Sequence, residues 1–207
     1  MSTLAAFDAH WRTAWSAVGR HTPPAALRDA LLARYAEPHR HYHTLQHLGE
    51  CLDAFARERA HAQRSGEVAL ALWFHDAVYD LHAHDNELRS ADWARDALRA
   101  EGIDAAAAQR VHDLVMATTH DAQPADADAR LLVDIDLSIL GAPTERFAEY
   151  ERQIRAEYAH VPPDVFEPRR RLILGRFLAR DPLYQTPGMR ARCEAQARTN
   201  LRGAIGD

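Results

Sequence analysis

The sequence predicts an all-α protein, and three observations support that fold class. Apolar residues recur at intervals of three and four along most of the 207-residue chain, the spacing that places them on one face of a helix. Strict alternation of apolar and polar residues, which is typical of a half-buried strand, persists nowhere. Proline, glycine and short polar clusters interrupt the apolar pattern repeatedly, as helix boundaries do.

In the N-terminal half, prolines, glycines and capping residues divide the chain into helices. The expected ranges are about 3–19, 25–35, 44–63, 67–79 and 86–100. Pro24 opens the second helix and Pro38 ends it, because proline fits the first turn but interrupts a helix interior. Thr44 and Asn86 have side chains that can cap the third and fifth helices. The fourth range is strongly apolar, so we expect a buried helix there.

The C-terminal half is divided in the same way. The expected ranges are about 104–120, 127–140, 144–159, 165–180 and 187–204. Asp104 can cap the first of these helices, and Gly141 with Pro143 ends the second. The last three are amphipathic and are separated by proline-containing turns. We find no repeat and no linker, so a single domain is expected.

One aromatic stripe leaves the oligomeric state open. Phe7, Trp11 and Trp15 fall on one face of the first predicted helix. This face is either core or the surface of a homodimer.

Composition excludes several classes of protein. The chain is 47% hydrophobic and 27% charged, as in ordinary globular proteins. Its two cysteines, Cys51 and Cys193, lie far apart, which argues against a disulfide framework and fits a reducing compartment. No segment has the roughly 18 apolar residues of a membrane span, and no signal-peptide pattern is present. The net charge of −5 argues against nucleic-acid binding. We therefore expect a cytoplasmic protein that binds neither membrane nor nucleic acid.

A histidine and an aspartate stand together in the apolar range 67–79. A buried charge is costly unless it is paired or bound to a metal, so His75 and Asp76 indicate a metal site. His47 lies in the helix before them, and Asp134 and Asp136 lie in a second apolar helix after them. These two acids point in nearly opposite directions, so one of them is expected to face the site. Two histidines and two carboxylates suit a divalent Mn, Fe, Ni, Zn, Co or Mg ion.

The order His, His-Asp, Asp on successive helices resembles the HD superfamily of metal-dependent phosphohydrolases. Several sequence segments are also similar to those of a bacterial branch, the predicted metal-dependent HD phosphohydrolases. The similar segments are 42–47, 73–80, 86–91, 134–141 and 197–201. The resemblance implies an HD-domain helical bundle with additional C-terminal helices. Residues 1–207 would form one domain, with a metal-binding core at about 40–141 and helices 144–204 packed on it.

Carried over residue by residue, the resemblance implies metal ligands at His47, His75, Asp76 and Asp136. Asp136 matches better than Asp134, because the family's last aspartate opens a run like Asp-Leu-Ser-Ile-Leu. Asp134 is the reserve. The number of bound ions, one or two, stays open.

The neighbouring polar residues are candidates for catalysis and substrate binding. Either Glu87 or Asp80 would act as general base, although each also suits a helix end. His43, His120 and Arg40 would bind the phosphate of the substrate. The expected reaction is metal-assisted hydrolysis of a phosphate ester or anhydride in a small phosphorylated metabolite or nucleotide.

Two other functions remain as alternatives. One is an HD module that binds a nucleotide without turnover. The other is a di-iron HD oxygenase, which needs further histidine ligands. The candidates for those ligands are His82, His84, His112 and His120, none of which forms an adjacent histidine pair.

Overall fold

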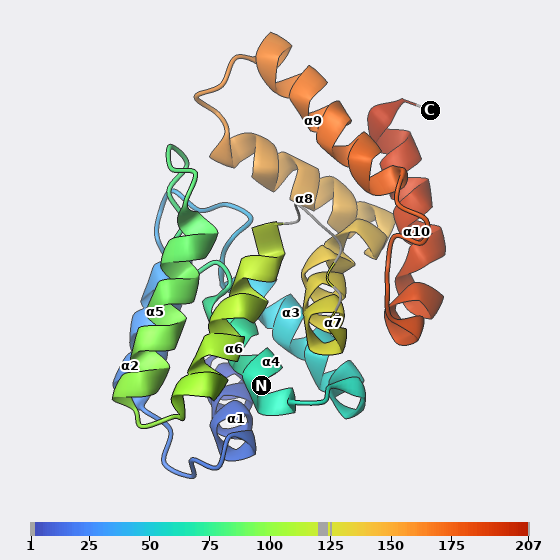
Figure 1. The fold of residues 1–207 in the computed structure, drawn as a ribbon. Helices are drawn as coiled ribbons and strands as arrows, with labels where there is room; N and C mark the ends of the chain where they lie inside the picture. Colours follow the sequence, from blue (N-terminus) through green and yellow to red (C-terminus); the bar gives the residue numbers. More distant parts are fainter. Residues whose placement is uncertain (1–2, 120–123, 125, 207) are drawn as a thin grey trace. The chain divides into compact units, whose positions relative to one another are not determined.

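The computed structural model confirms the all-α fold class. It describes residues 3–119, 124 and 126–206, and within these ranges the chain forms helices and connecting turns with no strand. Its contacts divide it into two compact units, Met1–Val133 and Asp134–Asp207 (Figure 1). The expectation of one domain over the whole chain stays a prediction.

In the first unit, helix α4 is central. The elements that begin there are α1 (Thr3–Ala17), α2 (Ala25–Tyr35), α3 (Leu45–Glu58), η1 (Arg59–His61), α4 (Ser65–Phe74), α5 (Asn86–Ala100), α6 (Ala105–Met116), η2 (Ala117–Thr119) and α7 (Ala127–Asp136). Helices α1, α3, α5 and α6 all contact α4, which is buried from Gly66 to Phe74 (Figure 1). The core of the unit therefore surrounds the helix that leads into the His-Asp pair.

The aromatic stripe of α1 belongs to this core. Phe7, Trp11 and Trp15 are each at most 2% exposed. The Trp11 ring meets the Trp73 ring of α4 edge-on, with 4.8 Å between centroids. Of the two interpretations of the stripe, the structure supports core packing.

Two of the three predicted helix caps are confirmed. The Thr44 hydroxyl accepts a hydrogen bond from the Gln46 N–H at the start of α3, and the Asp104 carboxylate accepts bonds from the first turn of α6. The prediction for Asn86 is wrong. Asn86 is the first residue of α5, and its amide bonds to the backbone N–H and C=O of Asp80 instead.

The predicted range of the fourth helix is also wrong at its end. Helix α4 stops at Phe74, and residues 75–80 form a turn, a bend and irregular chain, although apolar residues continue as far as Tyr79. A helix can end inside an apolar run when side chains elsewhere satisfy the backbone groups that it leaves free. Tyr35, Arg40 and Ser90 supply such side chains here.

The second unit contains the end of α7 and four further elements. These are η3 (Leu137–Gly141), α8 (Thr144–Glu157), α9 (Pro163–Leu178) and α10 (Pro187–Ile205). Helix α10 packs against η3 and α9. The Asn200 amide donates to the carbonyls of Leu140 and Ala142, which ties α10 to the end of η3.

Among the described helices, none combines the length and the apolar character that a bilayer crossing requires.

Candidate metal centre

Three of the predicted ligands converge within the first unit. The Nε2 atoms of His47 and His75 are 3.0 Å apart. Asp76 Oδ2 lies 3.3 Å from the first and 3.1 Å from the second. His47 comes from the first turn of α3, whereas His75 and Asp76 directly follow α4. The contact between α3 and α4 therefore brings together residues that are distant in sequence.

One hydrogen bond orients the ring of His75. Its Nδ1 lies 2.8 Å from the Leu72 carbonyl oxygen, which can only accept. Nδ1 therefore carries a proton, and Nε2 is the ring nitrogen that faces His47 and Asp76. Histidines that bind metals are usually oriented in this way by a bond to the other ring nitrogen.

The cluster is buried except at Asp76. The side chains of His47 and His75 are 2% and 1% exposed, while that of Asp76 is 20% exposed. Burial opposes ionisation of Asp76. The positive charges of His75 and His43, with hydrogen bonds from His47 and His75, outweigh burial and hold the pKa of this carboxyl well below its usual range. Asp76 is therefore the ionised member and the one that solvent reaches.

The spacing of these atoms fits a shared metal ion. Neighbouring ligand atoms about 2.1 Å from one ion lie roughly 3.0 Å apart in octahedral geometry and roughly 3.4 Å apart in tetrahedral geometry. The three observed separations span 3.0–3.3 Å. Two imidazole nitrogens and a carboxylate suit several divalent transition metals. The donor set thus could hold a metal ion.

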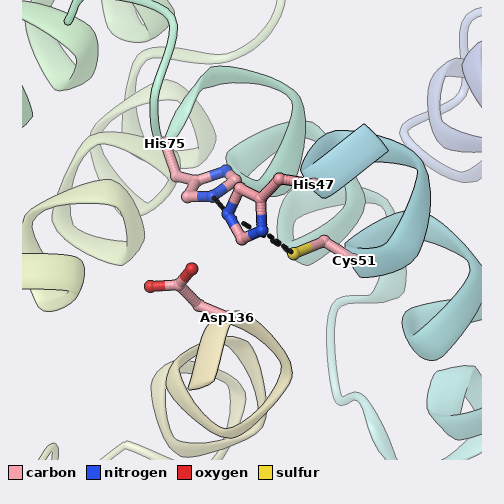
Figure 2. Close-up of side chains that lie close together, drawn as sticks. All are labelled: His47, Cys51, His75 and Asp136. Carbon is pink, nitrogen blue, oxygen red and sulfur yellow. Dashed lines mark hydrogen bonds between the residues drawn. The ribbon is translucent and has the colours of Figure 1, made fainter. Parts of the chain in front are cut away.

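Cys51 is a member of the cluster that sequence reasoning missed. Its Sγ lies 3.7 Å from Nδ1 and 3.8 Å from Nε2 of His47, and the thiol is buried (Figure 2). Ligand atoms of His47, Cys51 and His75 lie within 4.8 Å of one another. The sequence signal that could have found Cys51 is its spacing of four residues from His47, since residues i and i+4 share one face of a helix.

The fourth predicted ligand lies in the other unit. Asp136, also labelled in Figure 2, is the last residue of α7 and belongs to the unit that begins at Asp134. Its role as a ligand stays a prediction. The reserve candidate, Asp134, is engaged within that unit: its carboxylate accepts bonds from the N–H groups of Gln185 and Thr186 and from the Thr186 hydroxyl.

Side chains from several elements satisfy the backbone of residues 76–80, which follow His75. The Tyr35 hydroxyl accepts from the Asp76 N–H and donates to the Trp73 carbonyl. Ser90 accepts from the Val78 N–H. Further bonds come from Arg40 to the carbonyls of Asp76 and Ala77, from His39 to that of Tyr79, and from Asn86 to Asp80. Segment 86–91 is one of those that resemble the HD superfamily. Here its residues Asn86 and Ser90 bond to the backbone of Asp80 and Val78.

His43, Asp80 and Glu87 are candidates for catalysis or substrate binding that the structure describes. His43 stands beside the cluster, with its ring centroid 6.0 Å from that of His47 and 4.1 Å from that of Tyr79. Asp80 is exposed, and its carboxylate accepts the His82 N–H. Glu87 is partly exposed in the first turn of α5. No described contact joins Asp80 or Glu87 to the three converged ligands, and their catalytic roles stay predictions.

Two substrate-binding candidates differ in what the structure says of them. His120 lies outside the described residues. Arg40 is buried, and its guanidinium contacts backbone carbonyls and Glu37. This geometry favours a structural role for Arg40 over phosphate binding.

Three of the four histidines proposed for a second iron lie within the described residues. His82 and His84 are exposed, and His112 contacts Asp113 and Asp92. None of these three joins the ligand cluster found among the described residues.

Comparisons with protein-family models, with curated proteins and with solved structures found no match for this chain.

Proposed function

We propose that the chain is a metal-dependent phosphohydrolase that acts on a small phosphorylated metabolite or nucleotide. One observation carries the proposal: the Nε2 atoms of two buried histidines and a carboxylate oxygen of an aspartate lie 3.0–3.3 Å apart. The order of these residues along the chain resembles the HD superfamily, which supplies the reaction class.

The proposed ligands are His47, His75, Asp76 and Asp136. For Asp136 the support is the resemblance together with the use of its neighbour, because Asp134 already binds the chain before α10. Residues 127–133, which precede both acids in α7, belong to the first unit, so one helix runs from that unit to Asp136.

A bound divalent ion would supply a Lewis acid that polarises a phosphoryl oxygen and acidifies a bound water. The chain itself would hold the donors in place and leave the side of Asp76 open to substrate. His43, next to Tyr79 at the cluster, would donate to phosphoryl oxygens. Glu87 is the favoured general base over Asp80, because the Asp80 carboxylate already accepts the His82 N–H.

The proposal is tested first by metal content and then by turnover. Protein purified without chelator is analysed for bound metals and assayed on phosphorylated metabolites with Mn, Ni, Co or Mg added. We expect His47→Ala to lose both metal and activity. His61→Ala is the matched control, because His61 is 70% exposed just beyond the same helix.

Three results would count against the proposal. Equal metal binding by the His47→Ala variant would contradict the ligand assignment. Binding of a nucleotide without hydrolysis of any phosphate would favour the non-catalytic module. Two bound irons with consumption of oxygen would favour the oxygenase.

A further inference from the structure

Arg40 is a buried cation beside the candidate metal centre. Its side chain is 0% exposed. Nη1 donates to the carbonyl of Asp76 at 2.6 Å and to that of His43 at 3.2 Å. Asp76 is one of the converged ligands, and His43 belongs to the turn that leads into α3, where His47 lies. A single nitrogen of Arg40 therefore links the two chain segments that carry the three ligands.

The rest of the guanidinium is also engaged by the protein. Nη2 donates to the Ala77 carbonyl at 3.2 Å, and Nε pairs with Glu37 at 3.1 Å. The guanidinium carbon lies 5.4 Å from the ring centroid of Tyr35 and 5.5 Å from that of Tyr79. A buried charge is tolerated when it is paired and its donors are satisfied, as they are here.

We propose that Arg40 is a positioning residue, which sets the separation of His47 from His75 and Asp76 and so prepares the site for its ion. The proposal rests on the metal site of the proposed function. It replaces the phosphate-binding role, because the donors of Arg40 already point to carbonyls and to Glu37.

The physical reason is the cost of assembling the ligands. Residues 75–80 lack the regular hydrogen bonds of a helix, so their position depends on the side chains that contact them. If that position were lost, ion binding would have to restore it, and the cost would reduce the affinity. Arginine suits this task because its planar fork reaches several carbonyls at once, whereas a lysine offers one nitrogen.

The test compares Arg40 with an arginine of similar contacts in the other unit. Arg155 donates to the carbonyls of Tyr158 and Val161 at 2.6 and 3.1 Å, and it lies over the Phe166 ring. The variants are Arg40→Gln, Arg40→Lys, Arg155→Gln and Arg155→Lys. For each, Co²⁺ affinity is measured by competition with a coloured chelator, and the melting temperature is measured with chelator present.

We expect both pairs of variants to melt lower than the parent. The Arg40 variants should also lose roughly 10–100-fold in Co²⁺ affinity, as other residues that orient metal ligands do. They should change the visible absorption of bound Co²⁺, whereas the Arg155 variants keep the parental affinity and spectrum. Parental affinity in a folded Arg40 variant, or an equal loss in the Arg155 variants, would overturn the proposal.

A milder variant keeps the test decisive if the Arg40 variants do not fold. Glu37→Gln removes the counter-charge of Arg40 and leaves the carbonyl contacts, so a several-fold loss of Co²⁺ affinity is expected, and parental affinity would refute the proposal. A parent that binds no Co²⁺ would also refute it. A parent that binds Co²⁺ but hydrolyses no phosphate would count against the proposed activity alone.

Discussion

Asp134 and Asp136 stand two positions apart, yet the chain engages Asp134 in a defined structural contact. Asp134 Oδ1 accepts the Gln185 N–H at 2.9 Å, and Oδ2 accepts the Thr186 N–H and hydroxyl at 2.6 Å each. Thr186 is the residue before α10, so the Asp134 carboxylate fixes the start of that helix. Burial raises the pKa of Asp134, against the opposing effect of these hydrogen bonds. A residue used in this way is a poor candidate for a metal ligand.

Substitution of each acid by its amide separates the two roles. We expect Asp134→Asn to lower the free energy of unfolding by about 1–3 kcal/mol, because it disturbs buried hydrogen bonds to a carboxylate, and to leave metal affinity unchanged. Asp136→Asn should reduce metal affinity and leave the free energy of unfolding of the metal-free protein unchanged. Denaturant unfolding and metal titration on the same preparations measure both effects. Loss of metal in the Asp134 variant alone would make that residue the ligand.

The convergence of His47, His75 and Asp76 was predictable from the sequence, but the contacts that hold them in place were not. His75 and Asp76 stood out because polar residues in an apolar run need a partner or a metal. Two of the carbonyls that Arg40 contacts belong to residues 76 and 77, more than thirty positions away along the chain. Carbonyls are present at every position, so no residue type in the sequence marks them.

Helix starts were predicted more reliably than one helix end. Thr44 and Asp104 mark starts through local side-chain contacts, which the sequence displays directly. The end of α4 depends on Tyr35 and Ser90, which come from other helices. Apolar periodicity continues past Phe74 and so favoured a longer helix. Local signals predict elements well when the partners are local, and they fail where distant side chains replace the backbone pattern.

Close approach of η3 and α10 makes Gly141 sensitive to substitution. A Cβ at this position would lie 2.6 Å from Cys193 Cβ and 2.7 Å from its carbonyl oxygen, closer than real contacts allow. We expect Gly141→Ala to destabilise the protein by roughly 1–3 kcal/mol. Gly175→Ala is the control, since a Cβ there meets nothing within 4 Å; it should stabilise α9 by up to about 1 kcal/mol. Thermal melts of both variants should shift in opposite directions, and a neutral Gly141→Ala would contradict the packing.

Glu194 of α10 gives the second unit a pH-dependent contact. Burial opposes its ionisation, but the N–H groups of Tyr184 and Leu183, together with Arg198, lower the pKa of Glu194 below its ordinary value of 4.5. A lowered carboxyl pKa adds stability above the unfolded-state value, and that stability is lost as the pH falls through the folded value. The parent should therefore be more stable than Glu194→Gln at neutral pH.

This difference should shrink as the pH falls below about 4.5. Urea unfolding of the two proteins across that window measures it. A variant of the exposed surface acid, Glu167→Gln, should follow the parent at every pH, because its ion pair with Arg171 is 60% exposed on both sides. A difference between parent and Glu194→Gln that is constant with pH would refute the assigned contact.

For the whole molecule, metal binding should be linked to folding. His47 and the pair His75 and Asp76 lie in different segments of the first unit, and only the folded chain brings their ligand atoms within 3.0–3.3 Å. An ion that uses these atoms binds the folded state in preference to the unfolded state. Such binding raises the free energy of unfolding by about 2.7 kcal/mol when the free ion is at 100 times its dissociation constant.

Removal of metal should therefore lower the melting temperature of the whole protein. For a chain of this length the expected shift is roughly 5–10 °C between saturating Mn²⁺ and excess chelator, and it should grow with the ion concentration. His75→Ala should melt at the same temperature in both conditions, because it lacks a converged ligand. His61→Ala should keep the parental shift. The melt with saturating ion is repeated with Co²⁺ and with Ni²⁺. Melting temperatures of the parent that equal the value with chelator for all three ions would show that the three converged atoms bind no ion in the folded chain.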